Sequence, residues 1–265
     1  MKLNFELNRY SNHISIPVSI NGLGPMMFTI DTGATVSAIS SELASMLGIN
    51  SSFDFENKWS VIQLPYTIGK LDRFEIGSET LTNEEVLIMD FSSILKVPKG
   101  AMIGNIGHST LCNYTSIFDY PNSSFELLKD SVENLNMSRF TYIDETHLVG
   151  VPTYINGKGP FDFVVDTGSG GTVMSLDLVE QLELDLNQSY ALCRGVGGDA
   201  QGSFVHLNDI SVGDASMKDT NVMAVNFDEI SPRGNSIKNG IIGAPFLRNF
   251  SLVIDYPRRR FSFTS

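Results

Sequence analysis

The chain has few basic residues and only two cysteines, and each shortage argues against a class of function. With 18 lysines and arginines against 30 acidic residues, the net charge is -12. Nucleic-acid binding needs clustered basic side chains, and so does binding to an anionic membrane surface. The one basic run, Arg258 to Arg260, is expected to be a solvated turn. We therefore expect neither nucleic acid nor a membrane as a partner.

Long apolar runs and paired cysteines are missing as well. No segment approaches the roughly 18 apolar residues that would cross a bilayer. The N-terminal residues alternate apolar and polar like a strand and show no signal-peptide core, so we expect a cytoplasmic protein. Cys112 and Cys193 lie in no CxxC or Cys/His ligand pattern, which favours a reducing compartment and predicts no metal site.

What the chain does have is a globular composition and an internal duplication. Hydrophobic residues make up 42% and charged residues 18% of its 265 residues, which suits one large β domain or two smaller ones. The offset between matching positions is 135 residues from Asp31 to Asp166 and 136 from Gly77 to Gly213. Three separated blocks match at these offsets: 16–33 with 151–168, 71–91 with 207–227, and 106–125 with 242–261. The last block carries an Asp-Tyr-Pro triplet in both halves.

The duplication predicts the organisation of the chain. We expect an N-terminal lobe at 1–127, a polar linker at 128–137 and a C-terminal lobe at 138–265. Solenoids and propellers need three or more units to bury a core, so two copies argue against them. Two long similar units more naturally form a pseudo-dimer with a site on its two-fold axis.

Each half opens with a strand pair that leads to an aspartate. Asn21-Gly22 predicts a tight hairpin turn, and the apolar run 26–30 then stops at Asp31. In the second half the run 161–165 stops at Asp166 in the same way. A carboxylate placed just beyond a buried strand is held by rigid backbone, which suits a catalytic group.

A short helix is predicted after each aspartate loop, and strands for most of the rest. Ser40 and Ser175 are expected to cap these helices at their N-termini. The residues expected on their buried faces are Leu43, Met46 and Leu47 in the first half and Leu178 and Leu182 in the second. The fold class is therefore mainly β with a few short helices.

The two Asp-Thr-Gly triplets stand in matching contexts. Residues 28–35 read Phe-Thr-Ile-Asp-Thr-Gly-Ala-Thr, and residues 163–170 read Phe-Val-Val-Asp-Thr-Gly-Ser-Gly. An apolar element ending in glycine follows each, at 105–107 and 241–243. In these motifs, and over nearly its whole length, the chain resembles the pepsin and retropepsin clan of aspartic peptidases. It is most similar to bacterial retropepsin-like aspartyl proteases, here with two repeats fused. The resemblance implies a bilobal fold with two pseudo-two-fold-related lobes.

The resemblance makes Asp31 and Asp166 the expected catalytic dyad. Two carboxylates pressed together cannot both ionise cheaply, so such a pair keeps one proton over a wide pH range. The ionised member would take a proton from a water molecule that attacks the peptide carbonyl, and the protonated member would hydrogen-bond that carbonyl. This chemistry requires no metal and no cofactor.

The resemblance also implies supporting roles around the dyad. Thr32 and Thr167 should hydrogen-bond across the two-fold axis, and Gly33 and Gly168 should donate backbone hydrogen bonds to the carboxylates. Ser169 should contact the outer oxygen of Asp166, which its counterpart Ala34 cannot do for Asp31. The elements around Gly107 and Gly243 should pack behind the two loops.

A flexible β-hairpin flap covers the cleft in this clan. In the second half, residues 193–202 contain four glycines, and the residues expected at the hairpin tip are Gly195, Val196, Gly197 and Gly198. A phosphate-binding loop is disfavoured because no Gly-Lys-Ser/Thr follows. The aligned segment of the first half lacks glycine and contains Trp59, which predicts a stiffer, substrate-lining wall there, although a core role for Trp59 is equally compatible.

The histidines are expected to have no catalytic role. His13, His108, His147 and His206 are dispersed without ligand spacing, so surface or hydrogen-bonded buried positions are expected for them. His108 stands nearest the predicted centre because it follows Gly107, but the second repeat has Ala244 there.

The sequence thus predicts an aspartic endopeptidase that hydrolyses peptide or protein substrates and is active as a monomer, since each half supplies one aspartate. The alternative is a catalytically silent peptide-binding protein of the same fold. Substrate identity and cleavage preference are not encoded in any recognisable pattern.

Overall fold

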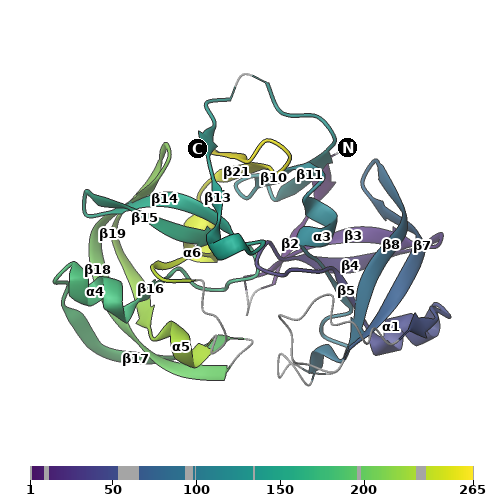
Figure 1. Cartoon of the computed structure of the whole chain (residues 1–265), viewed down its shortest axis with the longest axis horizontal. Coiled ribbons are helices and arrows are strands. Elements are labelled where there is room, and N and C mark those ends of the chain that lie inside the picture. The colour runs from purple at the N-terminus through teal and green to yellow at the C-terminus, as the bar shows by residue number, and fades with distance from the viewer. Residues whose placement is uncertain are drawn as a thin grey trace.

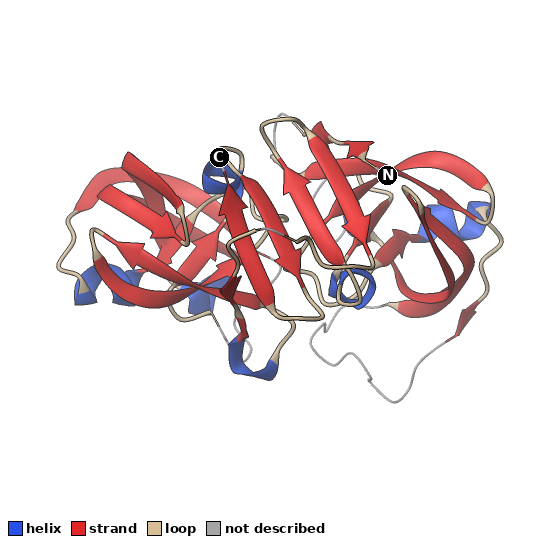
Figure 2. Ribbon diagram, turned by 90° about the horizontal axis from the view of Figure 1, so that it is seen from above, coloured by secondary structure: helices blue, strands red, loops and turns tan. Residues whose placement is uncertain are grey.

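The protein is built from two β lobes joined by a shared sheet. A computed structural model describes residues 2–8, 12–52, 66–92, 98, 100–133, 135–195, 198–230 and 237–264. Figure 1 shows the first half, in purple and blue, as one lobe and the second half, in teal and green, as the other. Figure 2 shows the same two lobes from above, with strands of the shared sheet between them. The predicted mainly β, bilobal architecture is confirmed.

An eight-stranded sheet forms the first lobe. The strands are ordered β2-β3-β4-β9-β5-β8-β7-β6, with β4 and β9 parallel. The strand bounds are β2 Glu6–Leu7, β3 Ile14–Ile20, β4 Leu23–Ile30, β5 Ala38–Ser40, β6 Ser51–Ser52, β7 Thr67–Ile76, β8 Glu79–Met89 and β9 Gly104–Ile106.

The sheet of the second lobe repeats this order strand for strand. It runs β13-β14-β15-β20-β16-β19-β18-β17, with β15 and β20 parallel. The strand bounds are β13 Thr141–Tyr142, β14 Val149–Ile155, β15 Lys158–Val165, β16 Val173–Ser175, β17 Leu186–Gly195, β18 Gly198–Val212, β19 Ala215–Val225 and β20 Gly240–Ile242. The duplication read from the sequence is therefore a duplication of the fold.

Strands from both halves meet in a third sheet. Its order is β1-β11-β10-β21-β22-β12, and β10 pairs with β21 across the middle. The bounds are β1 Leu3–Asn4, β10 Thr115–Asp119, β11 Ser124–Leu128, β12 Ser138–Arg139, β21 Ser251–Asp255 and β22 Arg260–Thr264. Leu128, expected as the first linker residue, is the last residue of β11. The lobe boundaries at 127 and 138 otherwise stay a prediction.

Local sequence signals explain the turns and helices. Asn21 and Gly22 both have positive φ, at 51° and 80°, as the hairpin turn between β3 and β4 requires. The Ser40 side chain accepts a hydrogen bond from Leu43 N at the start of α1 (Ser41–Met46), and Ser175 caps α4 (Leu176–Gln181) in the same way. Both predicted N-caps are confirmed. The remaining short helices are α3 His108–Leu111, the 3₁₀ turn η1 Ile143–Glu145, α5 Phe227–Ile230 and α6 Ala244–Leu247.

The placement of Met46 on the buried face of its helix is wrong. Its side chain is 70% exposed, whereas Leu43 is buried and Leu47 packs against the core. Leu43 and Leu47 stand four residues apart and share one face, and the helix ends at Met46 before a second turn can form. A six-residue helix therefore buries less than its periodicity predicts.

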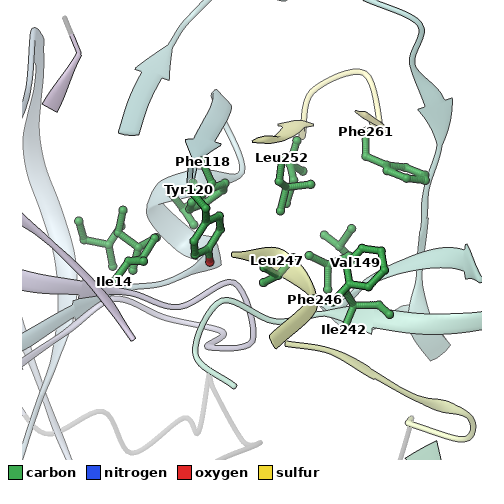
Figure 3. Close-up of a cluster of buried hydrophobic side chains, with 14 of the residues drawn as sticks. Ile14, Phe118, Tyr120, Val149, Ile242, Phe246, Leu247, Leu252 and Phe261 are labelled. Atoms are coloured by element: carbon green, nitrogen blue, oxygen red, sulfur yellow. The ribbon is translucent and has the colours of Figure 1, made fainter. Parts of the chain in front are cut away.

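One hydrophobic core runs through both halves. Its buried members include Phe28 and Phe118 from the first repeat and Phe163 and Leu252 from the second. Figure 3 shows the junction, where Phe118 and Tyr120 lie close to the second-repeat side chains Leu247 and Leu252. Because the apolar contacts cross from one lobe to the other, the lobes stabilise each other.

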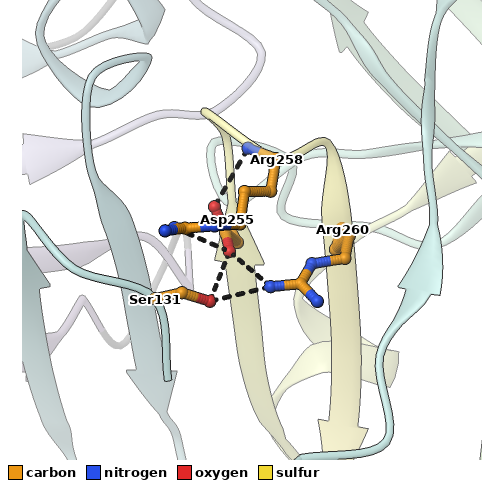
Figure 4. Close-up of polar contacts among 4 residues, drawn as sticks. All are labelled: Ser131, Asp255, Arg258 and Arg260. Atoms are coloured by element: carbon orange, nitrogen blue, oxygen red, sulfur yellow. Dashed lines mark hydrogen bonds and ion pairs between the residues drawn. The ribbon is translucent and has the colours of Figure 1, made fainter. Parts of the chain in front are cut away.

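A buried carboxylate ties the linker to the shared sheet (Figure 4). Asp255 is fully buried, accepts a hydrogen bond from the Ser131 hydroxyl at 2.6 Å, and pairs with Arg260 at 3.2 Å and Arg258 at 3.6 Å. Burial acts to raise the pKa of Asp255, but the hydrogen bonds from Ser131 and Arg260 outweigh it, so the pKa is lowered. The basic run is therefore not simply a solvated turn, since two of its arginines neutralise Asp255.

We expect Asp255→Ala to lower the free energy of unfolding by about 2 kcal/mol. The change removes the carboxylate acceptor that Arg260 and Ser131 share, although Arg260 keeps its hydrogen bond to the Ser131 hydroxyl and some contact with solvent. Urea denaturation measures the effect. Asp119→Ala is the matched control: Asp119 is the repeat counterpart and pairs with the exposed Lys2 at 3.2 Å, so its loss should cost about 1 kcal/mol or less. Equal losses for both variants would contradict the structural role of the buried cluster.

Candidate active site

The two aspartates stand at equivalent ends of two central strands. Asp31 follows β4, and its N–H donates to the Ile106 carbonyl of the parallel neighbour β9 at 2.9 Å. Asp166 follows β15, and its N–H donates to the Ile242 carbonyl of β20 at 3.1 Å. Each aspartate backbone is thus still hydrogen-bonded to the sheet, which fixes where its side chain begins.

The threonines that follow the aspartates lock the two loops together. The Thr32 N–H donates to Thr167 Oγ1 at 3.1 Å, and the Thr167 N–H donates to Thr32 Oγ1 at 3.0 Å. Each hydroxyl then donates across the interface, Thr32 to the Val165 carbonyl and Thr167 to the Ile30 carbonyl, both at 2.9 Å. Both side chains are only 1% exposed. The reciprocal contacts implied by the resemblance are present and hold the two lobes in register.

The carboxylates face each other across this lock. The Gly33 N–H donates to Asp31 Oδ1 at 2.9 Å, and the Gly168 N–H donates to Asp166 Oδ1 at 2.8 Å. A methyl group on Gly33 would lie 2.7 Å from the Asp166 carboxylate, and one on Gly168 would overlap the Asp31 carboxylate. Each aspartate therefore rests on the glycine of the opposite loop, and the two side chains lie within hydrogen-bonding reach of each other.

The surroundings of Asp166 favour its protonated form. Burial, followed by the charge of Asp31, raises the pKa of Asp166 well above its usual value, although hydrogen bonds from Gly168 and Gly33 act against the rise. Asp166 therefore holds a proton at pH values where an ordinary aspartate is ionised. Both aspartate residues are half-buried when backbone and side chain are taken together.

The glycine elements pack behind the loops, as expected. The His108 N–H donates to the Ala34 carbonyl at 2.8 Å, and the Ala244 N–H donates to the Ser169 carbonyl at 3.0 Å. A methyl group on Gly107 would lie 2.9 Å from the Ala34 carbonyl oxygen, and one on Gly243 would overlap the Gly171 carbonyl. Only glycine allows the backbones to approach this closely.

A family model described as aspartyl protease matches residues 16–107 and again residues 151–246. The two matches cover more than half of the chain and fall one on each repeat. The chain belongs to the aspartyl protease family.

Solved structures share the fold of this family member at very low sequence identity. Basic 7S globulin from soybean has 12% identity and a TM-score of 0.57, and conglutin gamma, a basic 7S globulin from lupine seeds, has 12% and 0.56; each is covered over 94% of its chain. Aspartic proteinase from Irpex lacteus has 10% identity, a TM-score of 0.59 and 97% coverage. All three match 100% of this chain. A comparison with curated proteins found no match. The likeness confirms the pepsin-like fold.

Ser169 differs from the expectation. Its hydroxyl donates to the Gly171 carbonyl at 2.8 Å, within its own loop, and not to Asp166. The expected difference between Ser169 and Ala34 therefore does not act through a direct hydrogen bond to the carboxylate.

The segment expected to form the flap is a hairpin, described up to its tip. Gly195 and Gly198 pair at the end of β17 and β18, while Val196 and Gly197 lie outside the described residues. A methyl group on Gly195 would lie 2.7 Å from the Ile230 carbonyl oxygen, so the hairpin end rests on α5. The role of this hairpin as a flap stays a prediction. Trp59 also lies outside the described residues, although β6 and β7 pair at the corresponding place in the first lobe.

A cluster of aromatic side chains beneath the loops was missed by sequence reasoning. His108 contacts the rings of His147, Tyr142 and Tyr256 at centroid distances of 5.8, 5.5 and 5.6 Å, and its Nε2 lies 3.2 Å from the Tyr142 hydroxyl. Burial and the neighbouring His147 lower the pKa of His108 to about 4. No spacing signal joins these residues, because they come from both halves and meet only at the lobe junction.

The repeated Asp-Tyr-Pro triplets gave one usable signal for this region. Their tyrosines, Tyr120 and Tyr256, are 4% and 2% exposed. Burial raises the pKa of both hydroxyls, and negative charge on Asp166 adds to the rise. The duplication marked these residues, but the sequence did not indicate why.

The described parts of the chain contain no group of three or more histidine, cysteine, aspartate or glutamate side chains that could hold a metal ion. Among the same residues, no helix is long and apolar enough to span a membrane.

We expect Thr32→Val to lower the free energy of unfolding by about 2–3 kcal/mol. The substitution keeps the shape but leaves the buried Thr167 N–H and Val165 carbonyl without their hydroxyl partner. Thr32→Ser retains the hydroxyl and is the control, with an expected loss of about 1 kcal/mol for the missing methyl group. Urea denaturation compares the two. If both variants were equally stable, the cross-loop hydrogen bonds would contribute nothing.

We expect the stability of the protein to fall as the pH drops from about 6.5 toward 4, in part through His108. The folded state holds this imidazole neutral, whereas the unfolded state protonates it near its ordinary pKa. The stability that His108 contributes is thus complete above its pKa in the unfolded state. It is lost as the pH falls through the lower pKa of the folded state. In His108→Gln, which retains a donor for Tyr142 but does not titrate, the melting temperature should fall less between pH 7 and 4.5. His206→Gln changes an exposed histidine and is the control; an identical pH dependence in wild type and His108→Gln would refute the assignment.

Proposed function

We propose that the protein is an aspartic endopeptidase that hydrolyses peptide bonds with a water molecule activated between Asp31 and Asp166. The observation that supports this proposal most directly is that two carboxylates from opposite repeats rest on each other's glycine loops and lie within hydrogen-bonding reach of each other. No structural role requires two acids in this position. Such a pair is costly, because one acid must stay protonated at pH values above its ordinary pKa.

The raised pKa of Asp166 suggests which member of the pair keeps the proton. Asp166, with its raised pKa, is the member that retains the proton and can hydrogen-bond the carbonyl oxygen of a substrate. Asp31 is then the ionised member, which accepts a proton from water as the water attacks the carbonyl carbon. The proton on Asp166 stabilises the negative charge that develops on the oxygen, and the proton gained by Asp31 is delivered to the leaving amine. The C–N bond breaks as the amine takes this proton, the hydroxyl of the water stays on the new carboxylic acid, and both aspartates return to the state from which they began.

An extended peptide or protein segment is the proposed substrate. The hairpin of β17 and β18 ends in glycines and has an outer strand with exposed Tyr190 and Leu192, at 65% and 58% exposure. Such a strand can add backbone hydrogen bonds and apolar contacts to an extended chain. Because one chain supplies both aspartates, we propose that the monomer is active. The cytoplasmic location expected from the sequence stays a prediction.

The second candidate is a peptide-binding protein without catalysis. It draws support from the seed globulins, since their names show that this fold is not confined to proteins named as proteinases. The retention of both aspartates and of the full cross-loop lock favours the peptidase, since binding alone needs neither acid.

We expect Asp31→Asn and Asp166→Asn each to reduce peptide hydrolysis by at least about 10³-fold, since either change removes the acid–base pair. The assay follows cleavage of denatured protein at mildly acid pH, with and without a statine-type inhibitor. Asp72→Asn alters an exposed acid on β7 and is the matched control, expected to retain full activity.

The same assay separates the two candidates and tests the monomer. Activity per molecule should not change on dilution, because no second chain is needed. Unchanged hydrolysis in both dyad variants would exclude the peptidase, whereas peptide binding without any hydrolysis in the wild type would support the silent binding protein.

A further inference from the structure

His147 is held rigidly in the turn that precedes β14. The Ile143 N–H donates to the Leu148 carbonyl at 3.0 Å, and the Thr146 N–H donates to the Ile143 carbonyl at 2.8 Å. The Thr146 hydroxyl donates to the same carbonyl and accepts the Leu148 N–H at 3.1 Å. With hydrogen bonds on both sides, the backbone of His147 is fixed and the imidazole is half-buried.

From this turn the imidazole reaches across to the first repeat. Its Nε2 lies 2.7 Å from the Gly33 carbonyl oxygen, and its Nδ1 lies 3.1 Å from Thr35 Oγ1. A carbonyl can only accept, so Nε2 carries the proton. In the neutral ring Nδ1 is then an acceptor, and the Thr35 hydroxyl donates to it. Both ring nitrogens are satisfied by residues that flank Ala34 in the loop of Asp31.

This contact acts on the loop that carries one catalytic acid. Gly33 receives the imidazole at its carbonyl and donates its own N–H to Asp31 Oδ1 at 2.9 Å. Burial lowers the pKa of His147, while the Gly33 carbonyl and the charge of Asp31 act to raise it. The imidazole and the Asp31 carboxylate therefore interact electrostatically. The imidazole thus holds the peptide that positions Asp31.

The other loop has no such support in the described residues. The turn of the first repeat carries the same backbone bond, from Asn8 N to the His13 carbonyl at 2.9 Å, at an offset of 135 residues from the bond between Ile143 and Leu148. At that offset His147 corresponds to Asn12. Within the described part of the chain no side chain donates to the Gly168 carbonyl. The two halves of the dyad therefore differ in what holds them.

We propose that His147 is a positioning residue for Asp31. From the second repeat it donates to the Gly33 carbonyl and fixes the Asp31 loop. The Asp31 loop thus has a side-chain support that the Asp166 loop lacks among the described residues. This inference rests on the proposed peptidase function and deepens it. It assigns a role in the reaction to a residue outside both Asp-Thr-Gly motifs.

The charged and titratable groups around His147 come from both repeats. Asp31 and His108 face it from the first repeat. On its own side, Tyr142 hydrogen-bonds His108, and Asp144 of the same turn pairs with Lys238 at 3.7 Å. Protonation of His147 would keep the Nε2–H donor but require the Thr35 hydroxyl to reverse and accept from Nδ1. The pH dependence of hydrolysis should therefore include the ionisation of His147. A glutamine at this position donates a hydrogen bond but does not titrate, so this ionisation should be absent from its pH profile.

The first test needs no activity. Imidazole ¹⁵N spectra of the full chain, with the His147 signals assigned by their loss in His147→Gln, should show the Nε2–H tautomer. In Asp31→Asn the pKa of His147 should move downward, because the negative charge that raises it is gone. An Nδ1–H tautomer, or a His147 pKa unmoved in Asp31→Asn, would overturn the proposal.

The second test uses peptide hydrolysis. His147→Ala should lower kcat by about three- to ten-fold, the value of one hydrogen bond, with KM within about two-fold. His147→Gln, which restores a donor, should recover part of kcat but lose one ionisation from the pH profile. His206→Gln serves as the control without effect. If His147→Ala behaved like His206→Gln, the positioning role would be wrong. If the wild type showed no hydrolysis at all, the proposed function would fail, and the spectra would still decide whether His147 holds the Asp31 loop.

Discussion

Two carboxylates held in contact are the constraint on which the rest of this structure depends. Each lies on the glycine of the opposite loop, so neither aspartate loop can move without its partner. Contact between two acids is stable only if one of them keeps a proton, and Asp166 is the member whose pKa is raised. The threonine lock, the parallel strands behind the loops and the shared sheet all prevent the two carboxyl groups from moving apart. Proton sharing is therefore a consequence of the fold and not of a local adjustment.

The duplication makes the two lobes similar, and a few residues that differ between equivalent positions of the repeats make their surroundings different. Strand order, helix caps and the threonine hydrogen bonds are the same in both lobes. The halves differ at His147, which has Asn12 as its counterpart, and at Asp255, which is buried where Asp119 pairs with an exposed lysine. Catalysis by such a pair requires two different roles for two identical groups. In the proposed reaction, the two similar lobes supply the matching carboxyl groups, and the support from His147 on one side would help to give them different roles.

The sequence predicted the features that depend on short segments or on the repeat, and it did not predict contacts between distant segments. The apolar runs that stop at Asp31 and Asp166, together with the constant offset, marked the two acids as equivalent, and the resemblance to the pepsin and retropepsin clan placed them together between two lobes. Ser40 and Ser175 were identified because an N-cap acts over three residues. His108 and His147 were not connected, because their contact joins segments 39 residues apart in chain order through the packing of two lobes. The prediction for Met46 was wrong for a related reason: periodicity indicates which residues share a face, but the packing of the lobe decides how much of that face is covered.

The dyad and the aromatic cluster beneath it respond to acid in opposite directions. Asp166 prefers its protonated form in the folded state, so its contribution to stability is complete below the ordinary aspartate pKa and is lost as the pH rises through the raised value. His108 and His147 prefer to be neutral, so their contribution is complete at neutral pH and is lost on acidification, for His108 as the pH approaches about 4. The same lobe junction carries both sets of groups. Acid therefore favours the protonation state that the proposed chemistry needs and at the same time weakens the junction that holds the acids together. The lower limit of the working pH should accordingly depend on the imidazoles behind the dyad as well as on the dyad, in which Asp31 must stay ionised to accept a proton.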